Sequence, residues 1–454
     1  MSELIVSNEL PSLVEPALEA CALCARPTPE LVPIVNLDQT LSKLALNALA
    51  PGQLPVGVCA RCVDILKRAQ HFVETHPGAF SETRFALPTW VRMDADETYT
   101  GKGVTMAFLD SGFYSHDDLI KPENRIVAYH SIFDREDDRT SLETTDAASW
   151  HGMMTSVVAA GNGHLSDGFY RGIAPDSNLV LVKIGRTGRI PEEQIQTGLE
   201  WVLENREKYN IRIVNISAGG DSVKSYLASS LCQTVERAVK EGLIVVCAVG
   251  NAGMAPGHPV LPPANSPSSI AVGGLDDQNS LDRAKRGMYR SSYGPTFDGL
   301  QKPEIIAPGI WVAGPILPST PTADQAELCS KLEVAVDEEL QSIIEANEGI
   351  DKDFDQSRDL PVPLLRQLIT IKLREGNVIN QHYKYIDGTS FAAPIVASIV
   401  ACMLEANPAL TPQLAKRILM DTAERVAGVE VERQGWGVVT PRRAVEVAAT
   451  LAPK

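Results

Sequence analysis

The chain has 454 residues, enough for one large domain and a smaller one, because domains usually run to about 100 to 200 residues. Its hydrophobic content of 44% and charged content of 22% are those of an ordinary soluble protein, and no stretch has the roughly 20 apolar residues of a membrane span. The formal net charge is −16, with Lys and Arg scattered along the chain. We therefore expect neither a membrane anchor nor a nucleic-acid partner.

The N-terminal 85 residues contain two CxxC pairs, Cys21-x-x-Cys24 and Cys59-x-x-Cys62, separated by 34 residues. Four thiolates at this spacing are compatible with one tetrahedral ion, so we predict a zinc-binding module over residues 1–85. Two disulfides or unrelated thiols are the alternatives. Both fit poorly with a start that lacks the basic and apolar regions of a secretory signal, and we expect a cytoplasmic protein.

A helix is predicted to leave the second cysteine pair, because residues 62–69 are amphipathic. Residues 76–78, His-Pro-Gly, break it. This arrangement resembles treble-clef zinc modules, and residues 59–69 resemble the zinc-binding module of ClpX-type unfoldases.

From Val104 onward, short apolar strand patterns alternate with helical ones. The predicted strands are residues 104–110, 178–184, 211–217, 243–250 and 269–274. Buried strands that alternate with helices predict an α/β fold with a mostly parallel sheet flanked by helices. In such a sheet ligands bind at the carboxyl ends of the strands, and residues 86–454 form this predicted domain.

A helical insert is predicted within this domain over residues 314–384. Five apolar residues recur every four positions and predict one helix with an apolar face: Leu328, Leu332, Val336, Leu340 and Ile344. Residues 364–373 predict a second helix, and the acidic segment 345–359 between them is interpreted as an exposed connection.

Ser390 lies in the segment Gly-Thr-Ser-Phe-Ala-Ala-Pro, directly before an apolar helical run that continues past Pro394. A serine at the start of a buried helix has its hydroxyl near the positive end of the helix, which suits a nucleophile. For an isolated Gly-Thr-Ser segment, an N-capping residue at the start of a core helix is the more common explanation. The motif alone therefore does not decide between the two.

Three further motifs have the same ambiguity. Asp110 ends an apolar strand and suits the orientation of an imidazole, but also the start of a turn. His151 heads a helix of small apolar residues, where a cap or a packed side chain is the alternative. Asn251 follows a strand and suits an oxyanion donor, but Gly-Asn also forms turns. Chance becomes a poor explanation when all four occur in one chain, each in the context that its role needs.

With these four motifs, residues 88–454 resemble the subtilases, the subtilisin-like peptidase family, whose residues occur in the order Asp, His, Ser. The resemblance implies a subtilisin-like fold and a serine endopeptidase that forms an acyl-enzyme on Ser390. It further implies that His151 is the general base, that Asp110 orients it, and that Asn251 stabilises the oxyanion. Residues 99–104, 171–184, 215–220, 291–309 and 407–439 support it.

The resemblance also implies a substrate-binding segment at Ser217, Ala218 and Gly219, where a peptide adds as a strand. Ala248 and Gly250 would belong to the opposite wall of the first specificity pocket. The alternative for residues 217–220 is a glycine-rich turn without a binding role.

Three positions depart from the usual pattern of the family: Met153 stands for Thr, Phe391 for Met and Ile395 for His. None removes a reacting group. The rival hypothesis is a catalytically idle or activation-dependent scaffold that binds a partner protein.

The N-terminal residues do not resemble the family's propeptide. We therefore expect that the zinc module or the insert gates access or recruits a regulatory protein. No EF-hand-like spacing marks a calcium site, so calcium binding is left open.

Overall fold

The computed structural model describes residues 19–21, 23, 27–28, 31–34, 57–76, 85–134, 138–186 and 190–453. The chain divides into two compact units, Met1–Gln70 and His71–Lys454. Helix α2 (Ala60–Thr75) crosses the boundary between them. The predicted end of the zinc module at residue 85 lies beyond this boundary and stays a prediction.

In its described residues, the small unit contains short strands and the first part of α2. Strands β1 (Glu19–Ala20) and β2 (Pro27–Thr28) pair antiparallel, and Val32 forms an antiparallel bridge with Val58. Helix α2 begins one residue after Cys59, so the helix predicted to leave the second cysteine pair is confirmed. It ends at Thr75, directly before the predicted break.

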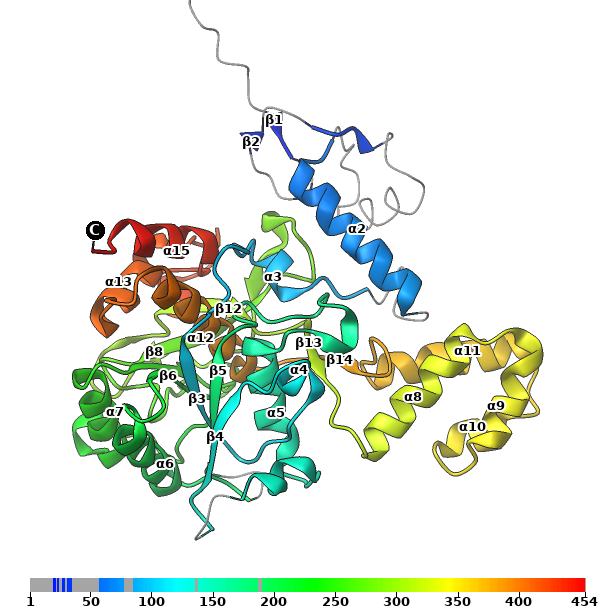
Figure 1. Ribbon diagram of the computed structural model, residues 1–454, viewed down its shortest axis with the longest axis horizontal. Coiled ribbons are helices and arrows are strands. Elements are labelled where there is room, and N and C mark those ends of the chain that lie inside the picture. Colours follow the sequence, from blue (N-terminus) through cyan, green and yellow to red (C-terminus); the bar gives the residue numbers. More distant parts are fainter. Residues whose placement is uncertain are drawn as a thin grey trace, which may run out of the picture. The chain divides into compact units, whose positions relative to one another are not determined.

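The large unit is built on an eight-stranded sheet with the order β12-β8-β7-β6-β3-β5-β4, in which β9 pairs with β8 (Figure 1). All pairs are parallel except β8 with β9. The strands are β3 (Thr105–Asp110), β4 (Ile126–Ser131), β5 (Asn178–Lys183), β6 (Ile211–Ile216), β7 (Ile244–Ala248), β8 (Ile270–Asp276), β9 (Gly287–Met288) and β12 (Ile305–Pro308). The five predicted strands and the mostly parallel sheet are thus confirmed.

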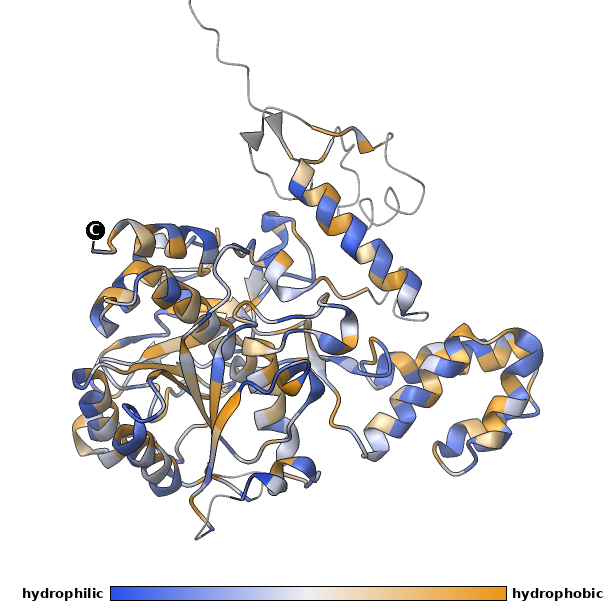
Figure 2. Cartoon of the chain, in the orientation of Figure 1, coloured by the Kyte–Doolittle hydropathy of each residue, from blue (hydrophilic) through white to orange (hydrophobic). Residues whose placement is uncertain are grey.

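Helices cover both faces of the sheet. Helices α6 (Glu192–Asn205) and α7 (Ser230–Lys240) pack on one face through a shared apolar core. Helices α5 (Ser149–Ala160) and α12 (Thr389–Ala406) pack against each other and against the strands. Strand β3 and helix α12 are buried along almost their whole length, whereas the outer helices α6 and α7 carry many hydrophilic residues, drawn in blue in Figure 2.

The remaining elements of the large unit are short or peripheral. Outside the insert and apart from short 3-10 helices, they are α3 (Thr89–Arg92), α4 (Asp117–Ile120), α13 (Pro412–Thr422), α14 (Val431–Gln434), α15 (Pro441–Thr450) and the paired strands β10 (Gly294–Pro295) and β11 (Gln301–Lys302). In the described part of the chain, only α12 is long and apolar enough to cross a membrane. Of that stretch, 83% is buried inside the protein, where α12 serves as the central core helix.

The strand order reverses around β3. In the sheet, β5 and then β4 lie on one side of β3. On the other side lie β6, β7, β8 and β12, in that order. Loops that leave β3 and its neighbours diverge at this point and leave a crevice at the carboxyl ends of the strands. Asp110 is the last residue of β3 and therefore stands at that crevice.

The insert is rooted in a two-stranded ribbon of β13 (Val312–Pro315) and β14 (Tyr383–Ile386), paired antiparallel. Four helices lie between these strands: α8 (Pro321–Val334), α9 (Leu340–Ala346), α10 (Lys352–Ser357) and α11 (Val362–Glu375). The helix predicted across residues 328–344 is wrong as one element, because Ala335 is extended (ψ 147°) and ends α8. The exposed connection is also wrong, because it contains α10 with Phe354 fully buried.

Most of the insert's apolar periodicity forms a core of its own. Leu328, Leu332, Leu340 and Ile344 are buried there together with Phe354, whereas Val336 is exposed. The predicted apolar face is therefore covered by the other helices of the insert.

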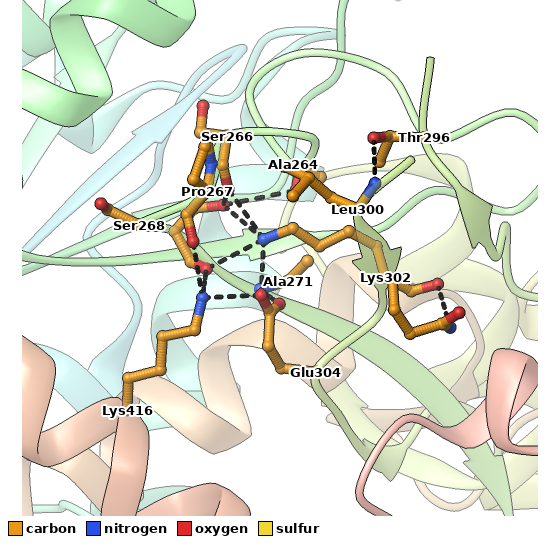
Figure 3. A network of polar contacts seen from close by, with 12 residues as sticks. Ala264, Ser266, Pro267, Ser268, Ala271, Thr296, Leu300, Lys302, Glu304 and Lys416 are labelled. Carbon is orange, nitrogen blue, oxygen red and sulfur yellow. Dashed lines mark hydrogen bonds and ion pairs between the residues drawn. The ribbon is translucent and has the colours of Figure 1, made fainter. Parts of the chain in front are cut away.

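A buried charge network joins β8, β11 and the residue before β12 to α13 (Figure 3). Two lysines donate to Glu304 Oε1, each at 2.6 Å: Lys302, which is fully buried, and Lys416, which is partly exposed. Lys302 also donates to the carbonyls of Ser266 and Ser269, and Glu304 Oε2 accepts from the N–H of Ala271. Burial lowers the pKa of Lys302 to about 8 from an ordinary 10.5. Glu304 is the anion that compensates the charges of both Lys302 and Lys416.

We predict that Glu304→Gln lowers the free energy of unfolding by about 3 kcal/mol at pH 7, since it leaves two cations without an anion. The loss should shrink as the pH rises through about 8, where Lys302 becomes neutral and no longer needs Glu304. Denaturant unfolding at pH 7 and pH 10 measures both effects. The exposed Glu348→Gln is the control, and adding Lys302→Met to the first variant should restore part of the loss. A pH-independent loss without rescue would contradict this account.

Candidate active site

Asp110 is nearly fully buried, and its carboxylate accepts several hydrogen bonds. Its two oxygens lie 2.8 and 2.9 Å from His151 Nδ1. The N–H of Ser111 donates to Oδ1 at 2.7 Å, and the hydroxyl of Thr155 donates to Oδ2 at 3.3 Å. These donors hold the carboxylate in one orientation beside the imidazole.

His151 is the third residue of α5, and two glycines bring that helix to the end of β3. A Cβ on Gly152 would lie 2.2 Å from the carbonyl oxygen of Gly112, and a Cβ on Gly112 would lie 3.0 Å from the carbonyl of Ala148. The backbones approach so closely that a side chain on Gly152 has no space. The His-Gly sequence therefore serves packing as well as chemistry.

The imidazole of His151 is flanked by two aromatic rings. The ring of Trp150 lies perpendicular to it at 5.1 Å, and the ring of Phe391 is tilted at 5.7 Å. Burial lowers the pKa of His151, but the negative charge and hydrogen bond of Asp110 outweigh it and raise the pKa above the ordinary 6.5. Phe391, the departure after the nucleophile position, thus packs on the candidate base.

Ser390 is the second residue of α12 and follows Gly388, whose φ of +137° is one that L side chains rarely adopt. Ser390 and His151 line the same cavity. Within the described residues no hydrogen bond joins the Ser390 hydroxyl to His151; it donates to the carbonyl of Ser217 at 3.4 Å instead. A hydrogen bond thus joins Asp110 to His151, and Ser390 lies in the same cavity as His151 without a hydrogen bond to it.

Asn251 is oriented by its neighbour Thr389. Its Oδ1 accepts from the N–H of Thr389 at 2.9 Å and from the Thr389 hydroxyl at 3.0 Å. Because a backbone N–H only donates, Oδ1 is fixed on that side and the Nδ2 donor is directed elsewhere. A Cβ on Gly388 would lie 3.7 Å from both Asn251 Nδ2 and Ser390 N, so these two donors flank space that the glycine leaves open.

The predicted substrate-binding residues lie on neighbouring strand ends. Ser217, Ala218 and Gly219 follow β6, and Ala248 and Gly250 lie at the end of β7, which pairs with β6 in parallel. A Cβ on Gly219 would have its nearest neighbour at 3.9 Å, so this position is open. Both segments therefore lie at the edge of the sheet where Asp110 stands.

Sequence reasoning missed three hydroxyl groups. Those of Ser111 and Thr155 support Asp110, and that of Ser217 donates to the carbonyl of Ser390 at 2.9 Å. The signal for Thr155 was its place four residues after His151, on the same face of the helix. The other two depend on contacts that no local pattern reveals.

The small unit brings three of the four predicted cysteine ligands together. The sulfur atoms of Cys21, Cys59 and Cys62 are buried and lie within 4.8 Å of one another. The N–H of Cys59 donates to the sulfur of Cys21 at 3.2 Å. Cys24 lies outside the described residues.

A carboxylate-bound imidazole, a serine at a helix start and two donors beside it are the groups of a serine hydrolase, here on an α/β sheet. The subtilase family profile matches residues 101–437. The chain therefore belongs to the subtilase family, and it is a subtilisin-like serine peptidase.

The chain is 30% identical to the serine protease AprX of Bacillus subtilis over 77% of its own length and 67% of that protein. It is 31% identical to subtilisin BL of Lederbergia lenta over 46% of the chain and 65% of the relative. It thus spans about two thirds or less of these relatives.

Among solved structures, the Clostridium perfringens CspB protease has a TM-score of 0.56 at 16% identity and covers 78% of this chain and 96% of its own. The protease domain of a PatA mutant gives a TM-score of 0.52 at 18% identity and covers 78% of this chain and 98% of its own. At these identities the two structures support the fold alone.

We predict that kcat/KM for a peptide amide rises with pH through a midpoint above 6.5, because a general base must be neutral and Asp110 raises the pKa of His151. Asp110→Asn should lower that midpoint and reduce turnover by about 10⁴-fold. Rate profiles from pH 5 to pH 9 measure both. An unchanged midpoint in Asp110→Asn would show that another group controls the profile.

Proposed function

We propose that this peptidase hydrolyses internal peptide bonds of proteins through an acyl-enzyme on Ser390. The observation that carries the proposal is the hydrogen bond between Asp110 and His151 in the cavity that Ser390 also lines. Asp110 holds the Nδ1 proton of His151 and so leaves Nε2 as the base. In the proposed reaction the Ser390 hydroxyl turns from the Ser217 carbonyl toward that base.

The acylation step follows from these groups. Nε2 of His151 takes the hydroxyl proton as Ser390 Oγ attacks the scissile carbonyl carbon. The resulting oxyanion accepts from Asn251 Nδ2 and from the N–H of Ser390, which lies in the first helical turn and has no partner within the helix. His151 then returns the proton to the leaving amine, and water attacks the ester by the same route in reverse.

An idle scaffold is not favoured, because each group needed for acyl transfer is present with its supporting contacts. Asp110 has its donors, Asn251 has a fixed amide orientation, and the position beside both oxyanion donors is kept open by Gly388.

We predict that Ser390→Ala abolishes hydrolysis of an internally quenched peptide, and that Asn251→Ala lowers kcat by roughly 10²- to 10³-fold with little change in KM. Loss of an oxyanion donor affects the transition state more than substrate binding. Asn347→Ala, in the insert, is the control. Peptide hydrolysis by purified Ser390→Ala would refute the assigned nucleophile.

We further propose that the small unit binds one structural zinc ion. Three sulfurs at ~2.3 Å from a tetrahedral ion lie about 3.8 Å apart, so the buried cluster of Cys21, Cys59 and Cys62 has suitable dimensions. Cys24 would complete the set. Such an ion would link the β1–β2 hairpin to the start of α2. Recruitment of a regulatory partner by this unit, and a cytoplasmic location, stay predictions.

The zinc proposal predicts about one equivalent of zinc per chain by elemental mass spectrometry. Cys21→Ser should release it at chelator concentrations that leave the wild type loaded, because three ligands hold zinc less tightly than four. Cys402→Ser, a buried thiol of the large unit, should retain the metal. Wild-type protein without zinc after purification in zinc-containing buffer would overturn the proposal.

A further inference from the structure

The root of the insert forms one wall of the cavity that contains Ser390 and His151. This cavity has a volume of about 770 Å³ and opens to solvent. One side consists of the loop before α5 and its first turns, together with Phe391. The facing side consists of residues 316–322, which lead into α8, and of β14 residues 384–386. The insert is therefore part of the reaction site.

Substrate geometry indicates which half of a peptide this cavity receives. A second hollow of about 310 Å³ also reaches His151 and is lined by Ser217, Ala218 and Gly219, which do not line the first cavity. If the proposed function holds, the acyl half of the substrate binds along that segment. The leaving half must then pass Ser390 toward the insert root, because Ser390 and Asn251 line the first cavity and not the second.

Part of the cavity lining, which we call the floor, is apolar and buried. Four almost fully buried side chains from three different parts of the chain form it: Met154, Ile316, Leu317 and Phe391. The ribbon below is fixed by strand pairing and by Tyr383, whose hydroxyl donates to the buried Asp118 at 2.6 Å. The subsite is thus held in place before substrate arrives.

Among the charged side chains that line the cavity, both carboxylates have a polar partner, whereas the lysine has none among the described residues. Asp146 is paired with Lys183 at 3.1 Å, and Asp387 accepts from Tyr289 at 2.8 Å. Lys384, by contrast, is half-buried, and within the described part of the chain its ammonium group has neither a hydrogen bond nor an ion pair. Burial lowers the pKa of Lys384, and no neighbouring carboxylate offsets that effect. A half-buried cation without an anion is costly, and an acidic ligand would relieve the cost.

We propose that the insert root is the subsite for the substrate residues that follow the scissile bond, and that Lys384 selects an acidic side chain there. The preferred leaving half carries an apolar side chain on the floor and an Asp or Glu carboxylate that accepts from Lys384. The insert is then a specificity element whose strands β13 and β14 present the cation.

Cleavage-site profiling of the full-length protein tests this proposal. A proteome-derived peptide library is digested and the sites are mapped by mass spectrometry. Asp and Glu should be about fivefold over-represented within the first three residues after the cleaved bond. Lys384→Met should abolish that preference, and Lys384→Glu should replace it with one for Lys and Arg. Lys352→Met, an exposed lysine of the same insert, should keep it.

A binding assay separates failure of this inference from failure of the proposed function. Immobilised Ser390→Ala is incubated with a random decapeptide pool, and retained peptides are sequenced by mass spectrometry. Enrichment of acidic over amide side chains that disappears in Lys384→Met/Ser390→Ala supports the subsite, even if no variant hydrolyses peptides. Equal retention or equal cleavage preference with and without Lys384 would overturn it.

Discussion

The close approach of α5 to the end of β3 is the constraint on which the rest of the site depends. The backbones of Gly112 and Gly152 lie so near each other that Gly152 has no room for a Cβ. This contact places His151 over the carboxylate of Asp110, and the strand order around β3 opens the crevice in which they meet. Side-chain chemistry at this edge is thus set by backbone packing.

A second constraint fixes the nucleophile helix. Thr389 is tied to Asn251, the Ser217 hydroxyl donates to the Ser390 carbonyl, and Gly388 supplies a backbone turn with φ of +137°. Three separate strand ends therefore hold the first turn of α12. Preorganised donors of this kind stabilise a developing oxyanion without further rearrangement, and in many enzymes such stabilisation contributes more to the rate than any other single effect.

Features that depend on local pattern were predictable from the sequence. The five apolar strands form as expected. Asp110 ends β3 and Asn251 follows β7, whereas His151 and Ser390 lie in the first turns of α5 and α12, and the four residues have the order that the family resemblance implied. Periodicity failed in the insert, because a regular spacing of apolar residues does not reveal the extended Ala335 or the burial of Phe354. Lys384 carried no signal, since its lack of a partner depends on residues far away in the sequence.

The central claim is that Ser390 is a nucleophile activated by His151, and active-site phosphonylation tests it most directly. The full-length protein is treated with a fluorophosphonate, digested, and the modified peptide is identified by mass spectrometry. The account predicts one adduct on Ser390, formed slowly in His151→Ala and not at all in Ser390→Ala. An adduct on another residue, or equal labelling of Ser390→Ala, would contradict it.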